Sequence, residues 1–126
     1  MPVSIKIEYV NEVLHVSVLG KFSIGSAKAT FIEMLHSLVK YRAEKVLVDC
    51  RLLKNMTQSA MTMYDYAETA ANELLNKNLD PKIAYLLSPK NHNEVTEFGE
   101  NVAFNRGVHV KIFHDNDAAL QWLAKD

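Results

Sequence analysis

The sequence is poor in the residues that build cross-links, thiolate metal sites and phosphate-binding loops. Cys50 is the single cysteine among 126 residues, so the chain can form no internal disulfide and no metal site made of several cysteines. The four glycines are scattered, and they form neither GxGxxG nor GxxxxGK followed by Ser or Thr. These absences exclude a disulfide-stapled domain and the common glycine-rich loops that bind nucleotide phosphates.

Long apolar runs and an excess of one charge are also missing. The apolar stretches are far shorter than the ~20 residues that span a bilayer, and the start, Met1 to Ser4, does not resemble a signal peptide. The 14 Lys and Arg residues balance 15 Asp and Glu residues, for a formal net charge of −1. This balance argues against nucleic acid or an anionic membrane as an obligate partner. We therefore expect a cytoplasmic protein without integral membrane insertion.

The residues that are present suit one globular domain spanning 1–126. The hydrophobic fraction of 48% and the charged fraction of 23% are ordinary for such a domain. A chain of this length is near the commonest domain size and can bury a core without staples.

The spacing of apolar residues predicts strands alternating with helices. Period-two alternation on both sides of Asn11-Glu12 predicts a β-hairpin. The short apolar runs 45–50 and 82–87 predict buried strands, and 108–112 predicts a last strand. Spacings of three and four predict helices over about 26–41, 59–76, 94–105 and 116–123. The order ββαβαβαβα predicts a single α/β domain with a mixed, mostly parallel sheet and helices packed on it.

Short polar residues and one glycine predict the ends of the later helices. Asn91, three residues before Glu94, is expected to cap the third helix, and Gly107 to stop it. Asp115 or Asn116 is expected to cap the last helix. Val95, Phe98 and Val102 are expected to face inward from the third helix.

No set of residues predicts catalysis, a metal or a cofactor. The five histidines form no HExxH motif and no pair at helical i, i+4 spacing; they are His15, His36, His92, His109 and His114. Cys50 lies near the end of a strand with no evident base beside it, which is typical of a small buried hydrophobe. Since no nucleophile, base and orienting group come together, we expect a protein that is not an enzyme.

Asp49 and the segment after it are candidate functional residues by position. Ligands of open α/β sheets bind beyond the carboxyl ends of the strands, where Asp49 lies; the alternative is a carboxylate that anchors the following loop. Thr57 or Ser59 is expected to cap the second helix. Because a helix N-terminus also favours a phosphate, either residue is a candidate phosphoacceptor.

The second helix carries more apolar surface than packing on a sheet requires. Its apolar residues extend beyond the Ala60, Met63, Ala67 and Leu74 face, with Tyr66 on one flank and Met61 and Tyr64 on the other. This surface, with Met56 nearby, calls for a neighbouring helix, a second subunit or a nonpolar ligand. We take Asp49, Met56, Met61, Tyr64 and Tyr66 as the candidate ligand or partner surface.

The chain resembles the SpoIIAA-like family of the STAS superfamily over its whole length. The resemblance rests on the element order, on VLVDCRLL at 46–53, on IAYLL at 83–87 and on the stretch 100–123. The resemblance implies the family's fold. Domains of this family are also similar to CRAL-TRIO lipid-carrier domains. In related anti-sigma factor antagonists a Ser at the start of the second helix is phosphorylated. That place falls on Gln58 here, so Thr57 or Ser59 would substitute only with a shift in register.

We therefore expect a non-enzymatic binding module without a cofactor. The first hypothesis is a regulatory protein-interaction domain that engages a protein partner, or itself as a homodimer, through the second helix and the loop before it. The alternative is a carrier or sensor of a nonpolar, lipid-like small molecule in a pocket beside that helix.

Overall fold

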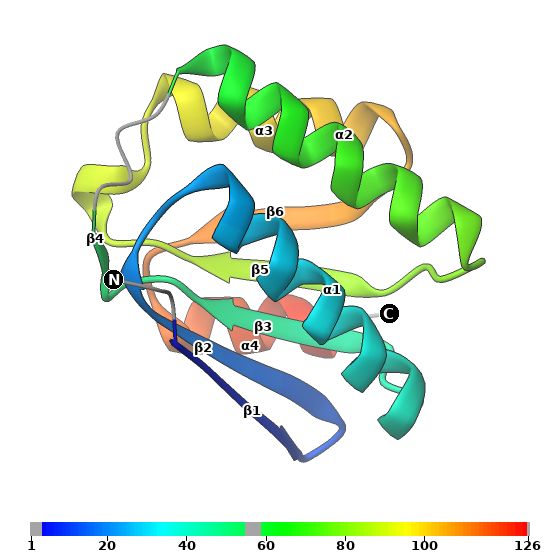
Figure 1. The fold of residues 1–126 in the computed structure, drawn as a ribbon. Helices are drawn as coiled ribbons and strands as arrows, with labels where there is room; N and C mark the ends of the chain where they lie inside the picture. Colours follow the sequence, from blue (N-terminus) through cyan, green and yellow to red (C-terminus); the bar gives the residue numbers. More distant parts are fainter. Residues whose placement is uncertain (1–3, 55–58, 126) are drawn as a thin grey trace.

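The computed structural model of the chain describes residues 4–54 and 59–125. The elements follow the predicted order (Figure 1), which confirms the α/β fold class. Their bounds are β1 Ser4–Val10, β2 Val13–Lys21, α1 Ile24–Tyr41, β3 Lys45–Asp49, β4 Leu53–Lys54, α2 Ala60–Asn76, β5 Lys82–Leu86, the 3-10 turn η1 Pro89–Asn91, α3 Glu94–Asn105, β6 His109–Phe113 and α4 Asn116–Ala124. The sequence patterns did not predict β4 and η1, because two or three residues are too few to show a period. No helix in the described ranges is long and apolar enough to cross a bilayer.

The strands form a mixed, mostly parallel sheet, as predicted. Its order is β1-β2-β3-β5-β6, and β4 pairs with the end of β2. β1 is antiparallel to β2, whereas β2, β3, β5 and β6 run parallel. Asn11 and Glu12 both have positive φ and form the two-residue turn of the hairpin, a geometry that matches the twist of the paired strands.

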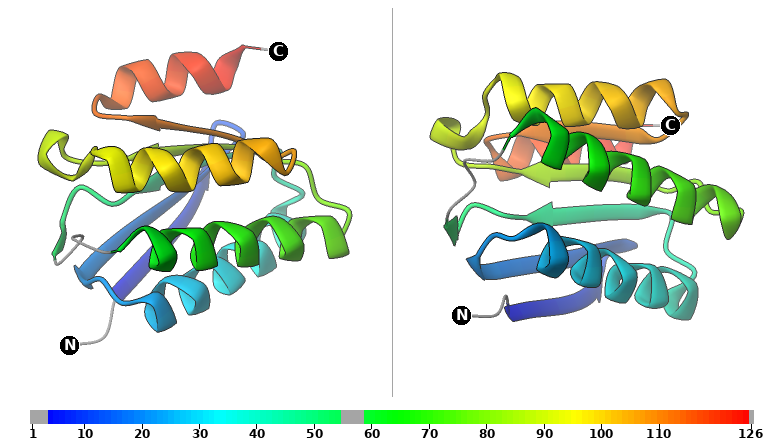
Figure 2. Two further views of the ribbon diagram at one scale, coloured as in Figure 1. Left: turned by 90° about the horizontal axis from the view of Figure 1, so that it is seen from above. Right: turned by 45° about the horizontal axis from the view of Figure 1, so that its top comes forward.

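Helices cover both faces of the sheet. α1, α2 and α3 lie on one face and α4 lies on the other (Figure 2). Because side chains alternate along a strand, Val46 and Val48 of β3 pack under the three helices, whereas Leu47 packs against α4. On β5, Ile83 and Ala84 divide in the same way. Burial on both faces explains why these two strands are continuous apolar runs in the sequence.

Side-chain caps begin each of the four α-helices that the structure describes. Backbone N–H groups of the first turns donate to the capping side chains, which are Ser23, Ser59, Asn93 and Asp115. The prediction of Asn91 as a cap is wrong, because Asn91 belongs to η1 and Asn93 forms a reciprocal capping box with Thr96. Gly107 follows α3 at a φ of 91°, the left-handed conformation predicted for it.

Alanine substitutions at two glycines test these backbone assignments, because they should change the free energy of unfolding in opposite directions. Gly107→Ala places a Cβ at positive φ, so we expect the free energy of unfolding to fall by about 1–2 kcal/mol. At Gly25, within α1, an added Cβ meets nothing within 4 Å. Gly25→Ala should therefore raise the free energy of unfolding by about 0.5–1 kcal/mol. Urea unfolding followed by circular dichroism measures both changes, and changes of the same sign would contradict the assignment.

Candidate functional site

An apolar cavity of about 130 Å³ lies between the sheet and the layer formed by α1, α2 and α3. The helical residues that line it include Phe31, Met63, Ala67, Ala70, Gly99 and Ala103. Native cores contain few voids larger than a water molecule, and an apolar cavity of roughly 150 Å³ can hold benzene or xenon. The space is therefore large enough for a small nonpolar molecule.

Small side chains on α2 and α3 leave this space open. Ala67 and Ala70 of α2 and Ala103 of α3 are buried, and all three line the cavity. At Gly99 the two helices approach closely, since an added Cβ would lie 3.6 Å from the Cβ of Met63. Because these four positions carry only alanine or glycine, they leave part of the volume above the sheet unfilled.

Tyr66 and Tyr85 meet at the cavity from opposite layers. Tyr66 belongs to α2 and Tyr85 to β5, and their hydroxyl oxygens are hydrogen-bonded at 2.9 Å. Both are half-buried and both line the cavity, so their remaining accessible surface includes the cavity wall. Desolvation raises the pKa of Tyr66 to about 12 and raises the pKa of Tyr85 well above its ordinary value. Both hydroxyls therefore keep their protons at neutral pH.

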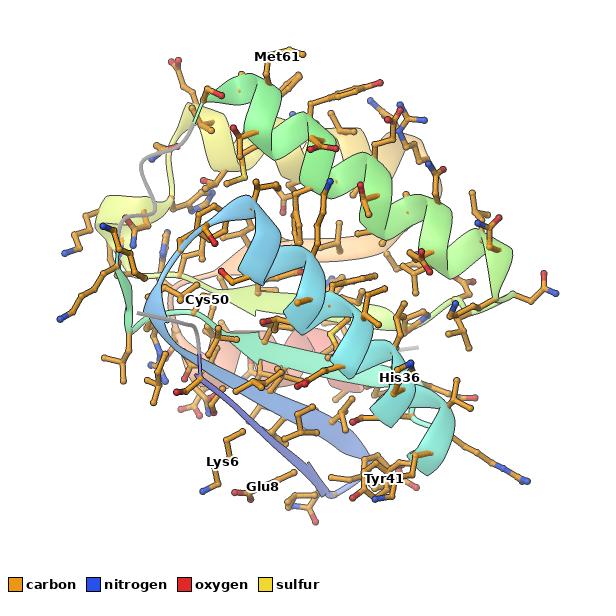
Figure 3. All side chains as sticks on the ribbon, viewed as in Figure 1. Lys6, Glu8, His36, Tyr41, Cys50 and Met61 are labelled. Carbon is orange, nitrogen blue, oxygen red and sulfur yellow. The ribbon has the colours of Figure 1, made fainter. Side chains whose placement is uncertain are left out.

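Cys50 lines the cavity as a protonated thiol. It is buried at the carboxyl end of β3 (Figure 3). Burial raises the pKa of Cys50 to about 12, and the neighbouring charge of Asp49 adds to the effect. A thiol in this state is a small apolar wall group, which agrees with the expectation that Cys50 is not a nucleophile.

The second helix divides the predicted ligand residues between two sides. Tyr66 lines the cavity, but Met61 and Tyr64 do not. Met61 is 75% exposed and points away from the sheet (Figure 3). Met61 and Tyr64 are thus separate from this cavity, and their role in a ligand or partner surface stays a prediction. On a helix of 3.6 residues per turn these two positions are rotated away from the inner face that carries Met63 and Ala67.

Tyr64 belongs instead to a surface cluster between α2 and α3. Its ring stacks on Phe98 with 6.4 Å between the centroids. Its hydroxyl donates to Glu68 Oε2 and accepts from Arg106 Nη2, and Arg106 also pairs with Glu68. The expectation that Phe98 faces inward is wrong, because 40% of Phe98 is exposed and its ring lies against Tyr64.

Asp49 holds the loop after β3. Its Oδ1 accepts hydrogen bonds from the backbone N–H and Nε of Arg51, and its Oδ2 accepts from Nη2 at 2.9 Å. Partial burial raises the pKa of Asp49, but the hydrogen bonds and charge of Arg51 outweigh it, so the pKa lies below its ordinary value. Asp49 does not line the cavity, and its geometry fits the loop-anchoring alternative.

Ser59 has the predicted capping role. Its Oγ accepts a hydrogen bond from the backbone N–H of Thr62 at 3.2 Å, which confirms Ser59 as the N-cap of α2. Met56 and Thr57 lie outside the described residues. Phosphorylation of Thr57 or Ser59 stays a prediction.

One histidine pair was missed by sequence reasoning. His92 Nδ1 and His114 Nε2 are 2.8 Å apart, and His114 Nδ1 lies 3.3 Å from the carbonyl oxygen of Leu87. The two histidines are 22 positions apart, so no local spacing signals the pair. Among residues 4–54 and 59–125, no three His, Cys, Asp or Glu side chains gather as a metal site would require.

Comparison with known proteins identifies the fold. No family model and no curated protein matches the chain. Among solved structures it is similar to an uncharacterized protein of the DUF3478 family with a SpoIIAA-like fold, from Shewanella loihica PV-4. The TM-score is 0.56 at 19% sequence identity, and the match covers 98% of this chain and 94% of that one. The chain therefore has a SpoIIAA-like fold, as the resemblance in sequence implied.

The Asp49–Arg51 contact predicts a pH-dependent part of stability. Since folding lowers the pKa of Asp49, its contribution is present above the unfolded pKa of about 3.9 and is lost as the pH falls through the folded value. We expect Asp49→Asn to lower the free energy of unfolding at pH 7 by at most about 1 kcal/mol, because the pair is partly exposed. The difference should shrink towards pH 3 in urea unfolding; an equal difference at both pH values would contradict this account.

Proposed function

We propose that the protein binds a nonpolar small molecule in the cavity between the sheet and helices α1, α2 and α3. The observation that carries the proposal is the cavity itself, about 130 Å³ of space with a largely apolar wall. A carrier or a sensor of such a molecule would use this space in the same way. The proposal thus favours the carrier or sensor alternative, which the large apolar surface of the second helix suggested. Of that surface, Tyr66 lines the cavity and Met61 does not.

The energetic cost of an empty cavity supports this function. By the figure of about 24 cal/mol per Å³ for enclosed core cavities, filling about 130 Å³ would add at most roughly 3 kcal/mol of stability. A typical domain has only about 5–15 kcal/mol in total. A nonpolar occupant would restore dispersion contacts to the wall and remove its own surface from water.

Benzene provides a direct probe of the cavity. At a benzene concentration of about 100 times its dissociation constant, the free energy of unfolding of the wild type should rise by about 2.7 kcal/mol. Ala67→Leu adds a larger side chain at the buried cavity wall and should abolish this stabilisation. Urea unfolding with and without benzene measures the effect.

A matched variant on the same helix separates cavity filling from a general effect of leucine. Ala60→Leu changes an exposed position of α2 and should leave the stabilisation by benzene unchanged. The proposal would be wrong if benzene failed to stabilise the wild type. Native mass spectrometry of protein purified from its own cells should also reveal a bound nonpolar molecule.

A second candidate function is a regulatory contact with a protein through the outer side of α2. The observation that favours it is the exposed apolar surface at Met61 and at Phe98, on each side of the half-buried Tyr64. Monomeric proteins expose large apolar groups singly as a rule, whereas gathered ones mark interaction sites. A second copy of the chain is the simplest partner to test.

Sedimentation velocity tests self-association through this surface. Tyr64→Asp removes the stacking on Phe98 and places a charge beside Glu68, so we expect it to shift a wild-type dimer towards the monomer. Tyr41→Asp is the control, because Tyr41 is also exposed but stacks on Tyr9 of β1. A strictly monomeric wild type, unchanged by Tyr64→Asp, would contradict the dimer.

A further inference from the structure

We infer that the molecule bound in the cavity is uncharged and carries one hydrogen-bond acceptor, such as a carbonyl oxygen, which the Tyr66 and Tyr85 hydroxyl pair binds. This inference rests on the proposed function, because it specifies the chemistry of the ligand that the cavity would take. It depends on the hydroxyl pair and on the charges of the cavity wall.

The hydroxyl pair has one proton more than its own hydrogen bond uses. Tyr66 and Tyr85 hold two hydroxyl protons and share a single hydrogen bond of 2.9 Å. Whichever hydroxyl donates, the proton of the other has no acceptor among the described residues. The two half-buried tyrosines line a largely apolar cavity. Because donors removed from water are nearly always hydrogen-bonded, an acceptor on the ligand would complete the pair.

Both tyrosine hydroxyls keep the protons that they need to donate a hydrogen bond. The pKa of each tyrosine is raised, above all by desolvation, so neither hydroxyl ionises near neutral pH. The edge of the Tyr66 ring also meets Phe31 of α1, with 6.2 Å between the centroids at an angle of 84°. Contacts to α1 and to β5 together hold Tyr66 in place at the wall.

Three other polar side chains of the wall are already hydrogen-bonded. Thr96 Oγ accepts from the backbone N–H of Asn93 within the cap of α3. Glu100 Oε2 accepts from the backbone N–H of Ile112 at 2.8 Å. Ser26 Oγ is hydrogen-bonded to Ser23 Oγ at 2.7 Å. The tyrosine pair is therefore the better site for a ligand oxygen than these three groups.

The charges of the wall exclude an anionic ligand. None of the described lining residues is Lys, Arg or His, and the acid Glu100 is among them. An ionised carboxylate would thus enter a space with no cation to balance it, which is strongly unfavourable. A ketone, ester or ether oxygen avoids this cost and still accepts a hydrogen bond.

Ethylbenzene and acetophenone form a matched pair of probes for the acceptor. They have similar size, but only acetophenone carries a carbonyl oxygen. We compare the ratio of their dissociation constants in the wild type and in the Tyr66→Phe/Tyr85→Phe double variant, measured by calorimetry. One neutral hydrogen bond corresponds to a change of about 2- to 12-fold in this ratio, in favour of acetophenone in the wild type.

The single variants and a surface control sharpen this test. Tyr66→Phe and Tyr85→Phe each leave one hydroxyl proton at the wall, so each should keep the preference for acetophenone that the double variant loses. Tyr64→Phe removes a hydroxyl that bonds Glu68 outside the cavity and should leave the ratio unchanged. Benzoate should not bind at neutral pH.

The outcomes separate this inference from the proposed function. If both probes bind with the same ratio in the wild type and the double variant, the acceptor inference fails and the nonpolar cavity stands. If neither probe binds the wild type, both proposals fail, and benzoate binding as tightly as acetophenone would overturn the uncharged ligand. The infrared carbonyl band of bound acetophenone needs no variant: a shift below its position in a hydrocarbon solvent supports the hydrogen bond, and an unshifted band overturns it.

Discussion

The close packing of α2 against α3 is the constraint on which the rest of this structure depends. Gly99 lets the helices approach at Met63, and alanines at positions 67, 70 and 103 keep the shared inner face thin. Helices packed on each other in this way cover the sheet as a pair, so they cannot each settle separately into its surface. The cavity lies between this helix pair, α1 and the sheet, and the small side chains of Ala67, Ala70 and Ala103 form part of its wall.

A tyrosine pair spans the space that this packing leaves. The Tyr66–Tyr85 hydrogen bond joins the helix layer to the centre of the sheet, in surroundings where water competes little and such bonds are strong. Cys50 and Tyr85 contribute to the same wall from the sheet, and desolvation keeps both protonated. The wall thus combines apolar surface with hydroxyl groups that are neutral, which is the chemistry of a site for a weakly polar molecule.

The two candidate functions use different sides of α2. Its inner side carries Ala67 and Tyr66 to the cavity, and its outer side presents Met61 to solvent. The sequence showed that this helix has more apolar surface than one sheet contact needs. Which part of that surface faces the cavity and which part faces α3 depends on the position of α3. The Tyr64 ring stacks on Phe98 of α3, thirty-four positions away in the chain.

Local sequence determined the order of the elements, most of their ends and the faces of β3 and β5, because periodicity, caps and turns depend on residues a few positions apart. Asn11-Glu12, Ser59 and Gly107 all have the roles predicted for them. The tertiary structure alone decided the sites. Phe98 stacks on Tyr64 at the surface, His92 lies against His114, and Tyr66 is hydrogen-bonded to Tyr85. Each of these contacts depends on a residue that is distant in the sequence. The cavity also depends on tertiary structure, because its wall is formed by residues of several helices and strands together.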